Sequence, residues 1–496
     1  MTPVNLIIGG SDDGLITQSG RMCNRHGLVA GATGTGKTVT LQTLAEGFSR
    51  MGTPVFAVDV KGDLSGIALA GEVNPKIEER LAAIALPDYR RQPCPTLLWD
   101  VEGIAGHPVR TTISEMGPLL MANLLELNDT QSGVLYAAFD LADDQGLLLL
   151  DMKDLRALLA WMGENDKALK AEYGNVTSAS LGAIQRRLLV LEEQGGHRFF
   201  GEPALQLADL MHTDFSGRGV VSLFDASRLI HTAPRLYAAF LLWLLADLFE
   251  QLPEAGDSSK PKLVMFFDEA HLLFSRAPRP LLDKIEQVVR LIRSKGVGVY
   301  FITQNPMDLP ENVLGQLGLK VQHALRAFTP KDQKTIRAIA GSFVPNPHFD
   351  TEAVVTALGI GEALVSVLGD DGRPQPVRKT LIAPPETRIG PLSEAERAAV
   401  LERSPIRGRY DNLVDRQSAY EMLMQRAEAA RVEETRHLAE LEREKLQRSE
   451  ARRQPAKGRQ RQSIGEFMIK SAARSIGSSI GRQIIRGVLG SLFGRR

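Results

Sequence analysis

The chain has 496 residues, enough for roughly three domains of ordinary size. Hydrophobic residues make up 43% and charged residues 24%, as in a globular protein, and the two cysteines, Cys23 and Cys94, exclude a disulfide framework and a four-cysteine zinc site. The 59 basic and 59 acidic residues cancel, but the segment from Arg452 to Arg496 is strongly basic.

The first 105 residues alternate short apolar runs with glycine-bearing loops. Four runs are typical of buried strands, and a helix is expected between two of them, at Thr38–Met51. Buried strands separated by helices predict an α/β fold with a mainly parallel sheet and helical crossovers. The four predicted strands are Asn5–Ile8, Gly27–Ala30, Val55–Val58 and Thr96–Trp99.

From about Glu115 to Leu210 the apolar residues recur at helical spacing, which predicts an all-helical insertion over residues 109–215. The most apolar stretch, Leu236–Ala246, is about half the roughly 20 residues that a membrane-spanning helix needs. We therefore expect a core helix there, no transmembrane segment, and, with so few cysteines, a cytoplasmic protein.

Strand-like runs return after residue 216, and Asp370–Gly372 predicts a hairpin turn. The core is therefore expected in two parts, 1–108 and 216–388. Residues 389–453 form a charged helical extension with a long helix at Tyr410–Arg453, whose apolar positions are sparse for a coiled coil. The five later strands are expected at Val220–Phe224, Lys262–Phe267, Val299–Ile302, Gln322–Ala327 and Ala363–Leu368.

A glycine-rich segment after the second predicted strand fits the phosphate-loop pattern and opens a helix. Its glycines allow backbone N–H groups to point at phosphate oxygens, and the helix adds its positive end. Lys37 would neutralise charge on the β- and γ-phosphates, and the hydroxyl of Thr38 would bind Mg²⁺. The predicted ATP-binding residues are Gly31, Ala32, Thr33, Gly34, Thr35, Gly36, Lys37 and Thr38.

Two carboxylates follow the predicted strand that ends at Phe267, where open α/β sheets place their ligands. Asp268 would hold Mg²⁺ through water, and Glu269 would act on the attacking water as a general base. The alternative is that both acids cap the next helix. Asp268 to His271 also spell the box of a helicase superfamily with two motor domains, but this chain has no room for two, so His271 is expected on a helix face.

Three further residues are candidates for a motor-type site. Gln304, at the tip of the strand beside the acidic one, could contact the γ-phosphate or its water; the alternative is a residue of a strand-end turn. Arg293, near a helix C-terminus, is a candidate arginine finger acting from a neighbouring subunit, or else a partner of the helix dipole. Arg326 is a second finger or sensor candidate. Asp59 and Asp63 are expected to line the site without a catalytic role.

The segments Arg25–Thr38 and Ile292–Pro306 resemble the HerA-like branch of the HerA/FtsK ATPases, and nearly the whole chain resembles the bacterial YjgR-type proteins of that branch. The resemblance implies a RecA-like core, ATP with Mg²⁺, and often a hexameric ring that passes DNA through its centre. The lysine, glutamate, glutamine and arginine of the HerA pattern fall on Lys37, Glu269, Gln304 and Arg293. HerA carries a β-barrel before this core, whereas about 26 residues precede the phosphate loop here, so functions of the barrel are not expected to transfer.

The basic tail, 454–496, has apolar residues largely four apart with arginines nearby. It could pack on its own core or on a neighbouring subunit, contact DNA, or lie on an anionic membrane. The leading functional prediction is an oligomeric ATPase motor acting on DNA. The alternatives are a membrane- or protein-associated ATPase that does not act on DNA, and a nucleotide-gated scaffold, against which Glu269 beside Asp268 argues.

Overall fold

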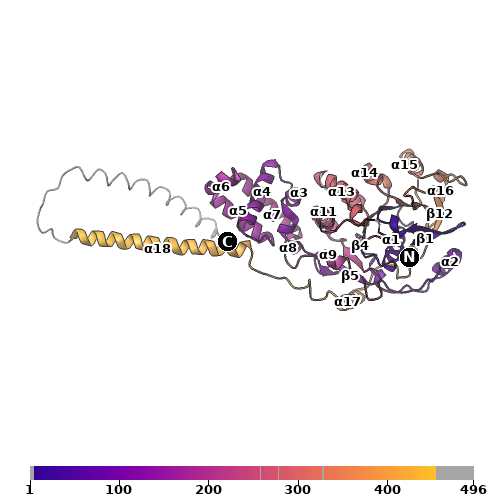
Figure 1. Ribbon diagram of the computed structural model, residues 1–496, viewed down its shortest axis with the longest axis horizontal. Coiled ribbons are helices and arrows are strands. Elements are labelled where there is room, and N and C mark those ends of the chain that lie inside the picture. Colours follow the sequence, from indigo (N-terminus) through magenta and orange to yellow (C-terminus); the bar gives the residue numbers. More distant parts are fainter. Residues whose placement is uncertain (1–4, 257, 277–278, 327–328, 454–496) are drawn as a thin grey trace. The chain divides into compact units, whose positions relative to one another are not determined.

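The computed structural model describes residues 5–453, except 257, 277–278 and 327–328 (Figure 1). Within these residues twelve strands form one sheet, in the order β2-β1-β12-β11-β10-β3-β9-β8-β4-β7-β5-β6. The α/β class is confirmed. The strands are β1 (Asn5–Ser11), β2 (Gly14–Ser19), β3 (Gly27–Ala30), β4 (Val55–Asp59), β5 (Thr96–Asp100), β6 (His107–Pro108), β7 (Val221–Asp225), β8 (Leu263–Phe267), β9 (Val297–Thr303), β10 (Leu319–His323), β11 (Glu362–Ser366) and β12 (Arg378–Ile382).

Every neighbouring pair of strands from β10 to β6 is parallel, which confirms the mainly parallel sheet. Their carboxyl ends therefore meet at one edge. The remaining strands, β11, β12, β1 and β2, extend the sheet by antiparallel pairing. The sequence prediction missed β2, β6 and β12. In β2 buried Ile16 and Gln18 alternate with more exposed residues, so no continuous apolar run marks the strand.

The predicted strand Gln322–Ala327 was wrong in its bounds, because β10 spans Leu319–His323. The strand pairs with β3 from Leu319 onward and leaves the sheet after His323. Beyond that point the backbone has other partners: the carbonyl of Ala324 accepts a hydrogen bond from the N–H of Ala32, 2.9 Å away. The predicted turn at Asp370–Gly372 is confirmed, since Gly372 N–H donates to the carbonyl of Gly369 between β11 and β12.

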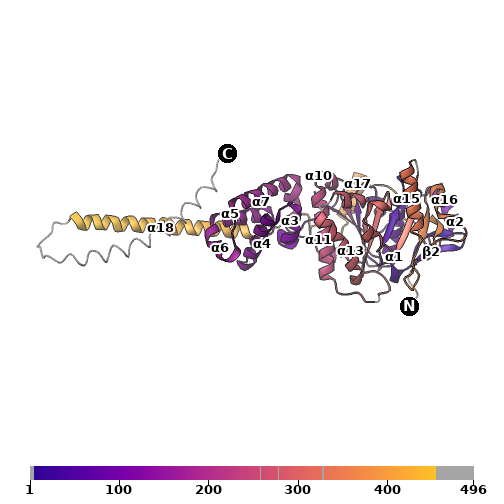
Figure 2. The same ribbon diagram turned by 90° about the horizontal axis from the view of Figure 1, so that it is seen from above.

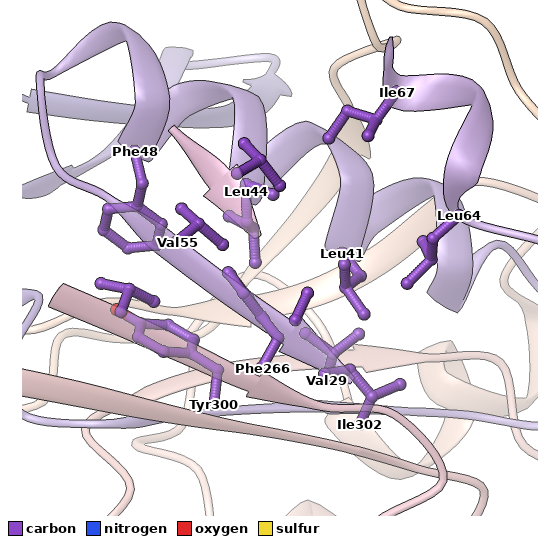
Figure 3. Close-up of a cluster of buried hydrophobic side chains, with 14 of the residues drawn as sticks. Val29, Leu41, Leu44, Phe48, Val55, Leu64, Ile67, Phe266, Tyr300 and Ile302 are labelled. Carbon is purple, nitrogen blue, oxygen red and sulfur yellow. The ribbon is translucent and has the colours of Figure 1, made fainter. Parts of the chain in front are cut away.

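Helix α1 (Lys37–Arg50) covers one face of the sheet. Leu41, Leu44 and Phe48 point from α1 into a cluster of buried residues, most of which belong to the strands (Figure 3). The ring of Phe48 meets that of Tyr300 edge-on at 5.4 Å, a favourable aromatic geometry. Because α1 starts at the phosphate loop, this packing fixes the loop against the sheet.

The opposite face is covered by α11 (Pro234–Gln251) and α12 (His271–Arg276). Phe240 of α11 packs on Phe224 of β7 at 4.8 Å, and Phe274 of α12 meets Phe301 of β9 at 5.6 Å. The apolar stretch Leu236–Ala246 is thus a core helix, as predicted. Across the described ranges, no helix has the length and apolar character to cross a membrane.

The helical region runs from α3 to α9 between residues 113 and 210. The chain separates into two compact units, one of residues 5–126 with 191–414, the other of 127–190 with residues from 415 on. The second unit therefore takes only part of the predicted insertion 109–215, and the first extends past the predicted core boundary at 388. The helices are α3 (Ile113–Leu124), α4 (Asp129–Asp144), α5 (Met152–Glu164), α6 (Asp166–Tyr173), α7 (Ser178–Leu191), α8 (His197–Phe199) and α9 (Leu207–Leu210).

In the second unit the long helix α18 (Ala419–Arg453) packs on α5 (Figure 2). Its start is fixed by Asp154, which accepts hydrogen bonds from the Ser418 hydroxyl at 2.5 Å and the Tyr420 N–H at 2.8 Å. The predicted start at Tyr410 was wrong. Tyr410 belongs to the first unit, where it is fully buried and meets Trp99 edge-on at 5.2 Å. The predicted tail 454–496 lies outside the described residues.

Candidate active site

The phosphate loop joins β3 to α1, and three glycines shape it. Gly31, Gly34 and Gly36 have φ of 154°, 78° and 111°, conformations that residues with a Cβ rarely adopt. Gly31 also lacks room for a side chain, because a Cβ there would lie 2.5 Å from the Cβ of His323. A loop curled in this way directs backbone N–H groups to one point beside the positive end of α1, which suits an anion.

Lys37 begins α1 and is nearly buried, at 6% exposure. Its Nζ donates hydrogen bonds to the carbonyl of Gly31 at 2.7 Å and to that of Ala32 at 3.1 Å. Burial lowers the pKa of Lys37, against the opposing charge of Glu269. The ammonium group thus lies against the loop itself, where phosphate oxygens would be its natural counter-charge.

The acidic pair lies on the same edge of the sheet as the phosphate loop. Strand β9 runs between β3 and β8, and it bonds to both segments: Gly31 N–H donates to the carbonyl of Thr303 at 3.3 Å, and Ala270 N–H to that of Ile302 at 2.8 Å. Two strand spacings, about 10 Å in all, therefore separate the loop from the acids. That gap suits a triphosphate between them.

Asp268 and Thr38 fit the ligand set of a magnesium ion. Asp268 is 2% exposed, and its Oδ2 has no hydrogen-bond partner among the described residues. Burial, together with Glu269, raises the pKa of Asp268 to about 7, and Lys61 opposes the rise. Carboxylate and hydroxyl oxygens are ligands that Mg²⁺ prefers. No group of three His, Cys, Asp or Glu in the described chain could hold a metal alone, so the ion would depend on phosphate oxygens as well.

Glu269 is 4% exposed and has contacts at both carboxylate oxygens. Oε1 lies 2.5 Å from Nζ of Lys61. Oε2 accepts a hydrogen bond from Nε2 of Gln304 at 3.4 Å and lies 3.2 Å from Nδ1 of His271. Burial alone would raise the pKa of Glu269, but Lys61 above all, then His271 and Lys37, lower it. The carboxylate therefore stays ionised near neutral pH, as a general base must.

His323 supports the phosphate loop from beneath. Its Nδ1–H donates to the carbonyl of Glu362 at 2.9 Å, because a carbonyl can only accept, which leaves Nε2 to accept from the hydroxyl of Thr40 at 2.8 Å. Burial lowers the pKa of His323 to about 4, with smaller effects of Lys37 and Arg80. The neutral ring therefore links β10, β11 and α1.

The predicted arginines lie on different edges of the sheet. Arg326 is exposed and follows Ala324 by two residues. The carbonyl of Ala324 accepts a hydrogen bond from Ala32 of the phosphate loop, so Arg326 lies at the sheet edge that carries this loop. Arg293 begins the short helix before β9 and thus lies at the opposite edge. Arg25 precedes β3 at that same edge, and burial together with the charge of Arg25 lowers the pKa of Arg293. Among the described residues neither Arg25 nor Arg293 has an ion-pair partner.

The structure thus brings the phosphate loop, Asp268, Glu269, Gln304 and Arg326 to one edge and leaves Arg293 on the other. Sequence reasoning expected Asp63 to line the site, but it missed Lys61 and His323 as site residues. Asp63 accepts a hydrogen bond from Thr38, and Lys61 contacts Glu269. The segment after β4 was expected at the edge that carries the acids, but the contact of Lys61 with Glu269 depends on the pairing of β4 with β8. His271, expected on a helix face, is the first residue of α12 and faces Glu269.

Comparison with known proteins gives one family. Residues 5–496 match the family described as Helicase HerA-like C-terminal. A curated relative, the DNA double-strand break repair helicase HerA of Sulfolobus acidocaldarius, is 25% identical over 171 residues, which cover 34% of this chain and 33% of that protein. The chain therefore spans about a third of the length of that relative.

Two solved structures of the bacterial conjugative coupling protein TrwBdeltaN70 resemble the chain. The unbound monoclinic form has a TM-score of 0.51 at 14% identity, and the trigonal form in complex with sulphate has 0.50 at 15%. Each covers 79% of this chain and 92% of that chain. At such identities the likeness shows the fold alone, a RecA-like P-loop core. The finer resemblance to YjgR-type proteins stays a prediction.

Proposed function

Because the chain belongs to the HerA-like helicase C-terminal family, we propose that it is a Mg²⁺-dependent ATP hydrolase that works as an oligomeric motor on DNA. One observation carries the hydrolase: the phosphate loop and the Asp268–Glu269 pair flank β9 at the same sheet edge. A protein that only binds a nucleotide needs the phosphate loop. It does not need a buried, ionised glutamate at the same edge of the sheet, which is the feature that a hydrolase requires as a general base. The motor and its DNA substrate rest on the family alone.

The reaction proposed is attack of water on the γ-phosphorus of ATP. The water oxygen bonds to phosphorus, the bond to the oxygen bridging the β- and γ-phosphates breaks, and Glu269 accepts the water proton. Lys37 neutralises negative charge on the phosphate oxygens, and Gln304, bonded to Glu269, orients the water. A magnesium ion held by Thr38 and Asp268 would supply further positive charge at the β- and γ-oxygens.

The position of Arg293 supports an oligomer. Strand β9 has seven residues between Arg293 and the active edge, a span of about 20 Å. An arginine side chain is far too short to cross it, so Arg293 could act as a finger only on the nucleotide of a neighbouring chain. Arg25 lies beside Arg293, and neither arginine has a carboxylate partner in the described part of the chain. The two guanidinium groups together could therefore bind an anion at this sheet edge. A closed ring, with a hexamer favoured, would place this edge against the next active site.

The test of the hydrolase is Glu269→Gln, which keeps the shape of the side chain and removes the base. ATP turnover should fall by about 10²–10⁴-fold while a fluorescent ATP analogue still binds with affinity near that of the wild type. Glu250→Gln, an exposed glutamate on α11, is the matched control and should behave as wild type. Unchanged turnover in Glu269→Gln would remove the proposed mechanism.

The DNA substrate has its own test. Duplex or single-stranded DNA should raise ATP turnover several-fold, and binding should weaken steeply with salt because phosphate contacts release counterions. Turnover that ignores DNA at low salt would overturn the DNA motor and leave the ATP hydrolase in place.

A further inference from the structure

Lys61 forms a contact that the proposed reaction does not use. It follows β4, and its Nζ lies 2.5 Å from Oε1 of Glu269. The Glu269 side chain is 5% exposed and that of Lys61 is 40% exposed. The lysine therefore covers the candidate base from the solvent side.

The backbone beneath Lys61 is fixed, whereas the side chain has room to move. Oδ1 of Asp59 accepts hydrogen bonds from the N–H groups of Lys61 at 3.2 Å and Gly62 at 2.7 Å, and Oδ2 accepts one from Leu64 at 3.0 Å. Because its backbone is held in place, the half-exposed side chain of Lys61 can change rotamer and move its ammonium group by several ångströms without a movement of the loop.

Glu269 itself is held in an uncommon conformation. Its φ is 45°, in the left-handed region that a glutamate seldom enters. Such conformations persist only where surrounding contacts enforce them, and they gather at functional sites. Here the enforcing contacts include the ion pair to Lys61 on one oxygen and the bond from Gln304 on the other.

The charges around this pair come from several elements. Glu269 faces the cations Lys61 and Lys37 and the ring of His271. Lys61 faces three carboxylates, of Asp268, Glu269 and Asp63. Two of these acids, Asp268 and Glu269, belong to the proposed magnesium and water site, and Asp63 accepts a hydrogen bond from Thr38. Among the described residues, no other lysine or arginine forms an ion pair with Glu269.

We infer that Lys61 is an inhibitory partner of the candidate base: it occupies Oε1 of Glu269 and must leave before that oxygen can accept the proton of the attacking water. The inference rests on the proposed function. While Nζ of Lys61 lies 2.5 Å from Oε1, that oxygen is engaged by an ammonium group and is not open to the attacking water. The negative charge of a bound triphosphate would attract the ammonium group of Lys61 away from Glu269. Glu269 would then be free to act as a base only when ATP is bound. Lys61 is thus a positioning residue, since it acts through Glu269.

The deciding variant is Lys61→Met, which keeps the stem and removes the charge, compared with Lys61→Arg, which keeps the charge. At the high-pH plateau kcat of Lys61→Met should exceed that of the wild type by about two- to tenfold, with KM for ATP changed less than about twofold. Lys61→Arg keeps the charge and should not show this rise in kcat, and the matched control Lys76→Met, on exposed helix α2 (Pro75–Ile84), should behave as the wild type.

A binding measurement provides a readout that does not depend on turnover. Mn²⁺ titrated into protein with ADP, followed by electron paramagnetic resonance, should bind about threefold or more tightly to Lys61→Met, because the acid cluster gains one net negative charge. A plateau kcat at or below that of wild type, or equal Mn²⁺ affinity, overturns the inference. Failure of the proposed function would show differently, as a wild-type protein whose turnover Glu269→Gln does not change.

Discussion

Mixing two inactive variants tests whether Arg293 serves the active site of a neighbouring chain. Arg293→Ala should lower ATP turnover by about 10³-fold or more if it removes an arginine finger. Glu269→Gln removes the base of the same chain that holds the phosphate loop. Neither pure variant should hydrolyse ATP appreciably, but chains of the two kinds in one oligomer can complement each other.

The expected recovery follows from the sheet. Because β9 separates Arg293 from the active edge by about 20 Å, a complete site needs Glu269 from one chain and Arg293 from the next. In an equal random mixture each of these is intact with a chance of one half, so about one quarter of the sites are complete. Turnover should therefore rise from near zero to about 25% of the wild-type value for independent sites.

The assay measures steady-state ATP turnover after the variants are mixed under dissociating conditions and reassembled. The control mixes wild type with the double variant, Glu269→Gln with Arg293→Ala. If Arg293 acts between chains this mixture should keep about one quarter of full activity, and if it acted within a chain it would keep about one half. No recovery in the first mixture, combined with half activity in the control, would refute the reasoning from the sheet.

Two further predictions concern stability. Phe48→Ala should destabilise the first unit by about 3–5 kcal/mol and lower its Tm by roughly 4–7 °C, because the ring is fully buried between Phe266 and Tyr300. Phe215→Ala, at a fully exposed ring, should shift the Tm little, and equal shifts would contradict the core assignment. His323→Gln should destabilise the first unit relative to the wild type at neutral pH, and this difference should shrink as the pH falls. The pKa of His323 is lowered from 6.5 to about 4 by burial, so its neutral ring contributes fully above pH 6.5 and progressively less towards pH 4. The Tm difference from wild type should be larger at pH 7.5 than at pH 4.5, and a constant difference would contradict it.

The parallel core was predictable because its signals are local. Apolar runs such as Leu263–Phe267 are buried on both faces, so every residue is apolar and the strand is plain in the sequence. Within the antiparallel extension β1 and β11 were predicted but β2 was not, because Gln18 lies buried in β2 with its amide satisfied by the backbone of Leu368, 350 positions away. A polar residue of this kind looks like a loop until its distant partner is known.

The candidate site divides in the same way. The phosphate loop has a fixed spacing of glycines and could be recognised directly. Asp268 and Glu269 could be expected at the same sheet edge, because open α/β sheets bind their ligands at the carboxyl ends of the strands. Lys61 could not be assigned by pattern, since a lysine in a loop is usually solvated. Only the order β8-β4 in the sheet, which sets the loop after β4 beside the acids, makes it a contact of Glu269.

The two ends of β9 have different roles in the proposed control of hydrolysis. At its carboxyl end Gln304 bonds to Glu269, so a change at the γ-phosphate reaches this strand within the chain that binds the nucleotide. Arg293 lies at the amino end of β9. Its carbonyl accepts a hydrogen bond from Asn24, which belongs to the segment that leads into β3. One fully buried strand therefore joins the site that a chain uses itself to the edge it would offer to its neighbour. Because buried strands move as rigid units, the proposed fingers would report the state of one nucleotide site directly to the next.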